Sequence, residues 1–340
     1  MEKKKRRWLI PVCIIAALIL FLLTINLIPP TLAVQENPFL KKETQVTMIA
    51  AHRGGGANNP ENTLKAYRAA VNDYRVDIIE TDLWLTKDGR LVYSHDRTVN
   101  RTSDAAILFG DAEKEYAIGD LTLEELQNLN FGYHFQDAEG NYPYRSLAGL
   151  DGANRKQVLK ENGLQIVEVT ELFQEFYASH PELLFIVEIK NGGEQGFTAA
   201  TVLDNALSAY PQYKQQLVVG TFHDEIQKDL EQNHPTLLTG ASTGAAASFI
   251  ITQLLKVNVF YQPTFACLQI PTSYNIKGIT LTLDRKTILR QAHRRNIAVQ
   301  YWTINDEQEM RHLIDLGCDA IMTDNPALLR NVVDSYPAKS

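Results

Sequence analysis

The stretch MIAAHRGGG at residues 48–56 shows the pattern that decides the fold, because a short apolar run leads directly into ionisable residues and glycines. The same order recurs along the chain at Ile78–Asp82, Leu91–Asp96, Leu184–Lys190, Leu217–His223, Ile297–Trp302 and Ala320–Asp324. Near-continuous apolar strands alternating with amphipathic helical stretches indicate a parallel sheet covered by helices. A (β/α)8 barrel builds its active site at the carboxyl ends of such strands, although a doubly wound open sheet would look similar strand by strand.

The length of 340 residues fits one large domain with appendages, since barrels of this type run to about 250 residues. The pattern starts near Val46, so we assign residues 46–335 to the barrel and residues 29–45 to a linker. It lapses over about residues 97–164, which predicts an inserted subdomain. Within the insertion, the capping-box sequence Thr122–Glu125 predicts the start of a helix.

The amino terminus has the features of a membrane anchor. Residues 1–7 include the basic cluster Lys3–Arg7, and the 21 residues Trp8–Ile28 carry no charge. A helix needs about 20 apolar residues to cross a bilayer, and basic clusters beside a first span tend to stay in the cytoplasm. We therefore expect a single-pass membrane protein with its barrel outside the cytoplasm. A signal peptide cleaved near Thr31–Ala33 is the main alternative, and lipidation at Cys13 is a weaker one.

The charge balance is acidic. The whole chain carries −7, and removal of residues 1–28, with their five basic and one acidic residues, leaves −11. An acidic surface argues against a nucleic-acid partner. The few cysteines lack the spacing of a zinc site or a disulfide framework.

Three carboxylates are the candidate metal ligands. Glu80 and Asp82 stand two residues apart on an expected strand, so both project from one face, and Glu188 and Lys190 repeat this spacing on a later strand. A single acidic residue is more often solvated or ion-paired. Three acids that converge on a barrel mouth repel one another unless a cation neutralises them, and oxygen ligands suit Ca²⁺ or Mg²⁺.

Two histidines, His52 and His95, also follow apolar runs, and as a pair beside a metal they suit general acid–base chemistry. Either one alone would more often be structural. Arg53 could fork onto a phosphate, and Lys190 would act as a point charge. Trp302 would form either a flat wall for the substrate or a cap on the barrel core.

These motifs resemble the glycerophosphodiester phosphodiesterase family. The resemblance rests on several blocks spread over about residues 46–333. They are HRGG at 52–55, PENTL at 60–64, ETD at 80–82, TKDG at 86–89, SHD at 94–96, EIK at 188–190, WTIND at 302–306 and LGCDAIMTDNP at 316–326.

The resemblance implies a (β/α)8 barrel that cleaves a glycerophosphodiester to glycerol 3-phosphate and an alcohol with one divalent cation. It implies metal ligands at Glu80, Asp82 and Glu188, catalytic histidines at His52 and His95, and substrate contacts from Arg53, Lys190 and Trp302. Three alternatives remain. The substrate could be a lysophospholipid or a cell-surface lipid polymer, and the barrel could be a non-catalytic lipid-binding module. A metal-dependent amidohydrolase is disfavoured because the first strand lacks an HxH pair.

Overall fold

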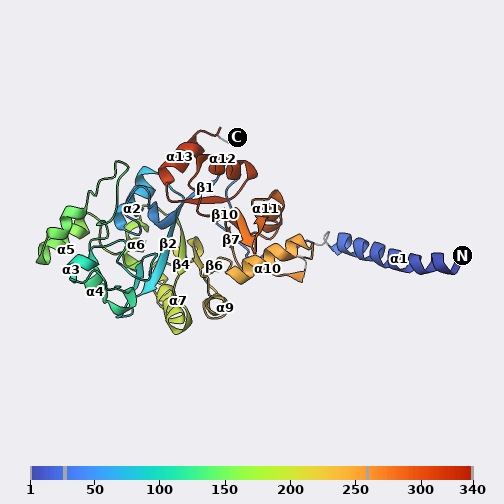
Figure 1. Cartoon of the computed structure of the whole chain (residues 1–340), viewed down its shortest axis with the longest axis horizontal. Coiled ribbons are helices and arrows are strands. Elements are labelled where there is room, and N and C mark those ends of the chain that lie inside the picture. Colours follow the sequence, from blue (N-terminus) through green and yellow to red (C-terminus); the bar gives the residue numbers. More distant parts are fainter. Residues whose placement is uncertain (1, 26–28, 258–259, 338–340) are drawn as a thin grey trace.

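The computed structural model describes residues 2–25, 29–257 and 260–337 (Figure 1). Eight parallel strands follow one another in chain order around a barrel, which excludes the open sheet. The bridge between Gly240 and Cys267 links the last neighbouring pair, so the barrel is nearly closed. The strands are β1 (Met48–Ala51), β2 (Ile78–Leu85), β4 (Leu184–Ile189), β5 (Leu217–Gly220), β6 (Leu238–Thr239), β7 (Cys267–Ile270), β10 (Ala298–Tyr301) and β11 (Ala320–Thr323).

The alternation of strand residues divides the core into two parts. Met48 and Ala50 of β1 belong to a small cluster inside the barrel, whereas Ile49 and Ala51 belong to the large cluster between the strands and the helices. Successive strand side chains point to opposite faces. Strand residues an even number of positions from a member of the inner cluster therefore face the barrel interior. Those among them that lie near the carboxyl ends of the strands face the mouth of the barrel.

Helices cover the outside of the barrel. Those that belong to the repeating barrel pattern are α2 (Leu64–Arg68) with the π-helix η2 (Ala69–Asp73), α6 (Val169–Phe176), α7 (Gly193–Leu207), α8 (Tyr213–Gln216), α9 (Asp224–Asn233), α10 (Thr243–Leu254), α11 (Lys286–His293), α12 (Glu307–Leu316) and α13 (Pro326–Asp334). Their apolar faces pack on the strands and complete the large core.

The segment before β1 packs against the barrel. Phe39 is fully buried in the inner cluster. Asn37 donates from Nδ2 to the carbonyl oxygens of Ala266 and Asn296 at 2.8 and 2.7 Å. These contacts lie where strands β7 and β10 begin. Residues around Phe39 therefore close the end of the barrel opposite its mouth.

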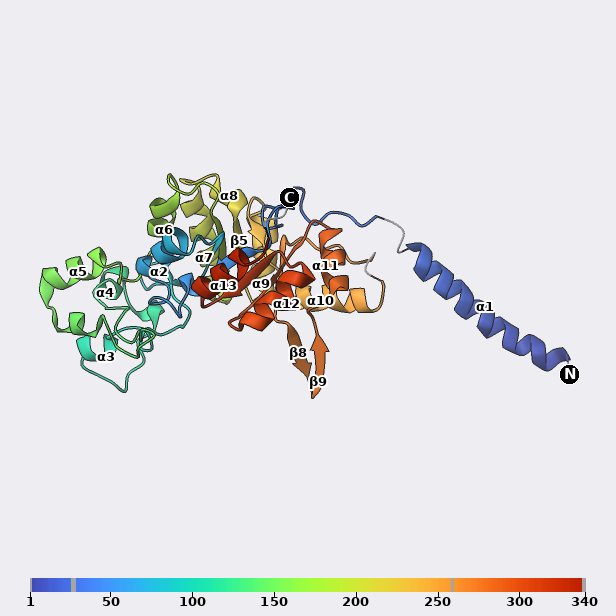
Figure 2. The same cartoon turned by 90° about the horizontal axis from the view of Figure 1, so that it is seen from above.

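The amino-terminal helix α1 (Glu2–Ile25) projects away from the barrel (Figures 1 and 2). Among the residues that the structure describes, no helix meets the length and hydropathy needed to cross a membrane. Met1 of the expected cytoplasmic tail and residues 26–28 of the expected span lie outside the described residues.

The insertion forms a subdomain of short helices beside the barrel (Figure 1). It has its own apolar cluster, which contains Leu126 and Phe131 together with Val92 from outside the insertion. Arg155 and Asp104 form a buried ion pair within it. The capping box at Thr122–Glu125 is confirmed. The helices are α3 (Ala105–Leu108), η3 (Ile118–Asp120), α4 (Leu123–Leu126), η4 (Arg145–Gly149) and α5 (Gly152–Glu161).

Two strand pairs depart from the simple repeat. Strand β3 (Leu91–Tyr93), expected as a barrel strand, instead pairs antiparallel with the extended end of β2, where Leu83 lies opposite Tyr93. After β7, strands β8 (Ser273–Ile276) and β9 (Ile279–Thr282) form a hairpin that projects from the molecule (Figure 2). The apolar pattern did not predict this hairpin, because its exposed position requires no buried face.

Candidate active site

A cleft of about 170 Å³ opens at the carboxyl ends of the strands. All eight candidate residues named from the sequence line it: His52, Arg53, Glu80, Asp82, His95, Glu188, Lys190 and Trp302. Sequence reasoning did not select Thr221, Phe222, Gln269 or Met322, which also line it. The position of Gln269 near a strand end was the available signal, but an uncharged residue in an apolar run gave no reason to select it.

The three acidic residues come from two neighbouring strands. Glu80 and Asp82 both lie within β2, which continues to Leu85, rather than at its end as expected. Asp82 pairs in register with Glu188 of β4. Glu80 and Asp82 are buried, at 5% and 2% relative exposure. The parallel pairing therefore places three carboxylates in one partly dry region of the cleft.

Cations stand among these carboxylates. The Nζ atom of Lys190 lies 3.4 Å from Oδ1 of Asp82 and 3.1 Å from Oε1 of Glu188. Burial lowers the pKa of Lys190, but the two carboxylates outweigh this effect and raise it above its ordinary value. Burial, together with the charges of Asp82 and Glu188, raises the pKa of Glu80 to about 7. Burial also raises the pKa of Glu188. The three carboxylates therefore carry more negative charge than the nearby cations neutralise.

The donor set suits a hard divalent cation. No three acidic, histidine or cysteine side chains among the described residues stand close enough to form a ready metal site. However, the buried Oδ2 atom of Asp82 has no hydrogen-bond partner in the described part of the chain. A buried, unpaired carboxylate oxygen is costly unless a cation or donor meets it. Carboxylates are also the ligands that Ca²⁺ and Mg²⁺ prefer.

The turn after β1 positions Arg53 against the carboxylates. The backbone N–H of Arg53 donates to Oε2 of Glu80 at 2.9 Å, and its guanidinium Nε lies 4.0 Å from Oδ2 of Asp82. Arg53 has φ of 54°, and Gly55 follows with φ of 91°. A Cβ on Gly55 would lie 2.7 Å from Cγ of Pro326, so this turn needs a glycine for both reasons.

His52 is held from the far side by an acid–amide chain. Its Nδ1 lies 2.6 Å from Oδ1 of Asp324, and Nδ2 of Asn305 donates to Oδ2 of Asp324 at 2.7 Å. Burial raises the pKa of Asp324, but His52, Asn305 and Arg53 together outweigh it and leave the pKa below its usual value. An ionised carboxylate only accepts hydrogen bonds, so His52 donates from Nδ1 and leaves Nε2 for the cleft. Burial lowers the pKa of His52, but Glu80 and Asp324 raise it above its ordinary value.

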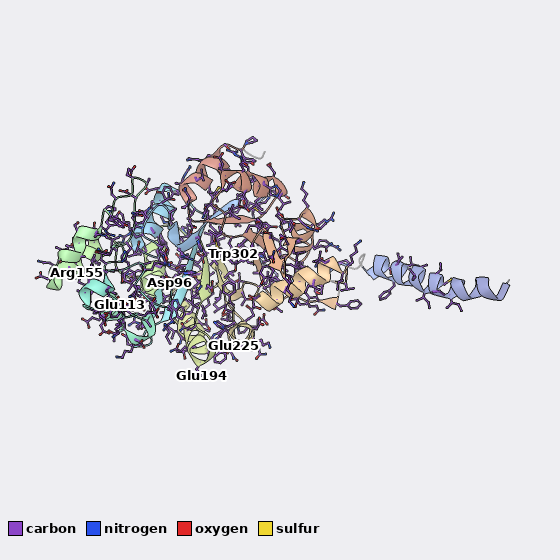
Figure 3. All side chains as sticks on the ribbon, viewed as in Figure 1. Asp96, Glu113, Arg155, Glu194, Glu225 and Trp302 are labelled. Carbon is purple, nitrogen blue, oxygen red and sulfur yellow. The ribbon has the colours of Figure 1, made fainter. Side chains whose placement is uncertain are left out.

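His95 lies in the loop after β3 and is held differently. Its Nδ1 lies 2.8 Å from Oδ1 of the next residue, Asp96. Nε of Arg101 donates to Oδ2 of Asp96 at 2.5 Å, and its terminal nitrogens donate to both carboxylate oxygens of Glu61. Figure 3 shows Asp96 on the side of the barrel that faces the insertion. Like His52, His95 thus keeps Nε2 for the cleft.

Aromatic side chains close the side of the cleft beyond Lys190. The rings of Phe222 and Trp302 lie 6.5 Å apart, edge to face, and Nζ of Lys190 lies 5.9 Å from the Phe222 ring centre. Phe222 is 57% exposed. Trp302 lines the cleft and also packs against the inner barrel cluster, so its position fits both expected roles, and each stays a prediction.

The chain is similar in sequence to proteins of known family. The model of the glycerophosphoryl diester phosphodiesterase family matches residues 52–328. A glycerophosphodiester phosphodiesterase from Caldanaerobacter subterraneus subsp. tengcongensis is 26% identical over 84% of this chain and 98% of its own length. The Mus musculus protein lysophospholipase D GDPD3 is 22% identical over 84% of this chain and 82% of its own.

Solved structures share the fold. The glycerophosphoryl diester phosphodiesterase domain of an uncharacterized Mycobacterium tuberculosis protein has a TM-score of 0.64 at 16% identity, covering 84% of this chain and 98% of that one. An Oleispira antarctica phosphodiesterase, solved with the product sn-glycerol-3-phosphate, has a TM-score of 0.58 at 20% identity, covering 85% and 97%. The match across residues 52–328 confirms the resemblance, and the chain belongs to the glycerophosphoryl diester phosphodiesterase family.

Proposed function

We propose that this chain hydrolyses glycerophosphodiesters to sn-glycerol 3-phosphate and an alcohol. The carrying observation is that His52 and His95 face one cleft, each with Nδ1 on a carboxylate and Nε2 left for the substrate. Membership of the family supports the reaction class. The product seen in the Oleispira antarctica structure supports sn-glycerol 3-phosphate as the product here.

The remaining cleft residues fit the binding of a phosphodiester. The cations Arg53 and Lys190 stand beside the carboxylates and would draw the phosphate to this part of the cleft. As the phosphorus is attacked, negative charge grows on its oxygens, and preorganised cations stabilise that charge. One histidine removes the proton of the attacking hydroxyl, and the other gives a proton to the leaving alcohol oxygen.

We further propose that one Ca²⁺ or Mg²⁺ takes part, held by Glu80, Asp82 and Glu188. The buried Asp82 oxygen that accepts no hydrogen bond from the described residues, together with the raised pKa of Glu80, supports a further positive charge there. When bound, such an ion polarises the phosphate oxygens as a Lewis acid. Lys190, now among these acids, would then share the phosphate with Arg53.

Chelation tests the metal proposal. After exhaustive treatment with a chelator, hydrolysis of glycerophosphocholine should stop, and Ca²⁺ or Mg²⁺ should restore it. Isothermal titration of the chelated protein with each ion would identify the preferred one. Full activity after complete removal of divalent ions would contradict the proposal, while leaving the reaction itself established.

We propose that the glycerol hydroxyl beside the phosphate is the first nucleophile, which gives a cyclic phosphate that water then opens. An intramolecular attack gains an effective molarity that can reach about 10⁵ M or more. A diester with this hydroxyl replaced by hydrogen should bind but turn over very slowly. Phosphorus NMR of single-turnover reactions should show the cyclic intermediate, particularly in the His52→Ala variant. Equal rates for the deoxy and parent substrates would instead mean direct attack by water.

A second candidate keeps the chemistry and changes the substrate to a lysophospholipid or a cell-surface lipid polymer. The similarity to a mouse protein named as a lysophospholipase D favours it, as does the exposed Phe222 at the cleft. Product analysis with glycerophosphocholine, lysophosphatidylcholine and a glycerol phosphate polymer separates these substrates.

We also propose that the chain is anchored with its amino terminus in the cytoplasm and its barrel outside. The basic cluster Lys3–Arg7 followed by the uncharged run Trp8–Ile28 supports this orientation. The described side chains of α1 include several exposed apolar residues, such as Ile10 and Leu20. Protease added to intact cells should digest the barrel, and protection until lysis would reverse the orientation.

A further inference from the structure

Two neighbouring glutamine side chains lie across the barrel from the acidic residues, and one of them, Gln269, lines the cleft. Gln269 of β7 and Gln300 of β10 are register partners on neighbouring strands. Nε2 of Gln269 donates to Oε1 of Gln300 at 3.1 Å. Strand β7 stands four places from β2 around the eight-stranded barrel, so Gln269 faces Glu80 and Asp82 across the cleft.

The pair has an unmet hydrogen-bonding demand. Gln300 is completely buried, and its Nε2 has no hydrogen-bond partner among the described residues. A buried amide donor is costly to leave unpaired, so such groups are normally met by another polar group. Of the two side chains, Gln269 is the one that lines the cleft, so a ligand can reach its amide but not that of the fully buried Gln300.

The barrel wall is shaped around the Gln269 amide. A Cβ on Gly240 would lie 2.7 Å from Oε1 of Gln269, and one on Gly220 would lie 3.6 Å from it. Any larger residue at position 240 would push the amide aside. Neither glycine has a positive φ, so their backbones do not require glycine. Because positions 220 and 240 carry no side chain, the barrel leaves room for the Gln269 amide.

The chemistry of this wall suits a hydroxyl group. An amide is neutral and both donates and accepts hydrogen bonds, as a hydroxyl does. The phosphate is instead drawn to Arg53 and Lys190, on the side of the acidic residues. A glycerophosphodiester bound with its glycerol unit across the cleft would present the far hydroxyl of that unit to Gln269.

We propose that Gln269, held by Gln300, binds the terminal hydroxyl of the glycerol unit. This inference rests on the proposed hydrolysis of glycerophosphodiesters and assigns the residue that recognises the glycerol unit. In a lysophospholipid acylated at that position, the hydroxyl is an ester, so it cannot donate, and its acyl chain meets the barrel wall. Gln269 is therefore the residue through which the enzyme discriminates against an acylated glycerol unit.

The test compares three choline diesters in full-length protein. Glycerophosphocholine has both hydroxyls, the propane-1,2-diol analogue keeps the hydroxyl beside the phosphate but lacks the terminal one, and lysophosphatidylcholine has it acylated. The wild type should prefer the first over the other two by at least about 10-fold in kcat/KM. Gln269→Leu should lower kcat/KM for glycerophosphocholine, leave the analogue unchanged, and bring their ratio close to one.

Two further variants sharpen this result. Gly240→Ala keeps the amide but displaces it, and should also reduce the preference, so it carries the test if Gln269→Leu fails to fold. Gln308→Leu makes the same exchange at an exposed position and should change neither rate. An equal loss on all substrates, or a preference that survives both cleft variants, would overturn the inference. If the wild type cleaved none of the diesters, the proposed function would fail instead.

Discussion

His52 is held by the barrel itself, whereas His95 is held by a loop that leads into the insertion. The carboxylate of Asp324 that contacts His52 follows β11, and its amide partner Asn305 follows β10. The carboxylate that contacts His95 belongs to the adjacent residue, Asp96. The side chain of His52 is 14% exposed, against 34% for His95.

This difference separates two ways of orienting one kind of side chain. Around His52, the direction of the imidazole is set by Asp324, which is 272 positions away, so only the closed barrel can supply it. Around His95, ion pairs from Arg101 to Asp96 and Glu61 fix the loop, and they are partly open to water. We therefore expect kcat to fall strongly when the carboxylate that contacts His52 is replaced. Replacing the carboxylate that contacts His95 should lower kcat less.

The largest expected effect comes from removing either imidazole. His52→Ala and His95→Ala should each lower kcat about 10²- to 10⁴-fold, the usual scale for a lost general acid or base. Steady-state rates on glycerophosphocholine measure this loss.

Cation binding should separate the roles of His95 and Glu80. Calorimetric titration should show that His95→Ala still binds the divalent cation, whereas Glu80→Ala binds it weakly. If both variants lost the cation equally, His95 would be a ligand rather than an acid or base.

The sequence predicted which residues form this site better than it predicted which residues orient them. Each candidate residue follows or lies within an apolar strand, so the barrel repeat alone brought His52, Glu80 and Lys190 to one mouth. The contact between His52 and Asp324 depends on β1 pairing with β11, which closes the barrel. Local sequence carries no signal of that closure, and the position of Gln269 opposite Asp82 depends on it as well.

The next effect tests the two carboxylates that orient the histidines. Asp324→Asn should lower kcat about 10²-fold, because the amide can donate to Nδ1 and favour the wrong tautomer of His52. Asp96→Asn should cost about 10-fold, because the exposed loop can readjust. Nitrogen NMR of the imidazole rings should show the tautomer change in Asp324→Asn. Equal losses in both variants, or an unchanged His52 tautomer, would contradict this ranking.

A smaller effect is expected at Arg101, which joins Asp96 to Glu61. The Arg101 side chain is 50% exposed, and exposed ion pairs contribute only about 0.2–1 kcal/mol. Arg101→Gln should therefore lower kcat/KM less than about 5-fold. The difference in kcat/KM between the wild type and this variant should shrink at high ionic strength, where exposed charges are screened. A loss as large as that of His95→Ala would mean that Arg101 itself contacts the substrate.

The smallest effect on turnover is expected from the buried ion pair of the insertion, although the effect on stability should be large. Arg155 and Asp104 are 3% and 1% exposed, and Arg155→Met leaves the carboxylate of Asp104 buried without its cation. Removing one partner of such a pair costs about 3–5 kcal/mol. No residue of the insertion lines the cleft within the described parts of the chain, so kcat should change less than about 3-fold. Urea denaturation with assays at low urea measures both quantities. Arg97→Met breaks an exposed pair with Glu115 in the same subdomain and should cost less than about 1 kcal/mol. If Arg155→Met abolished turnover while the protein remained folded, the insertion would support both histidines rather than only the loop of His95.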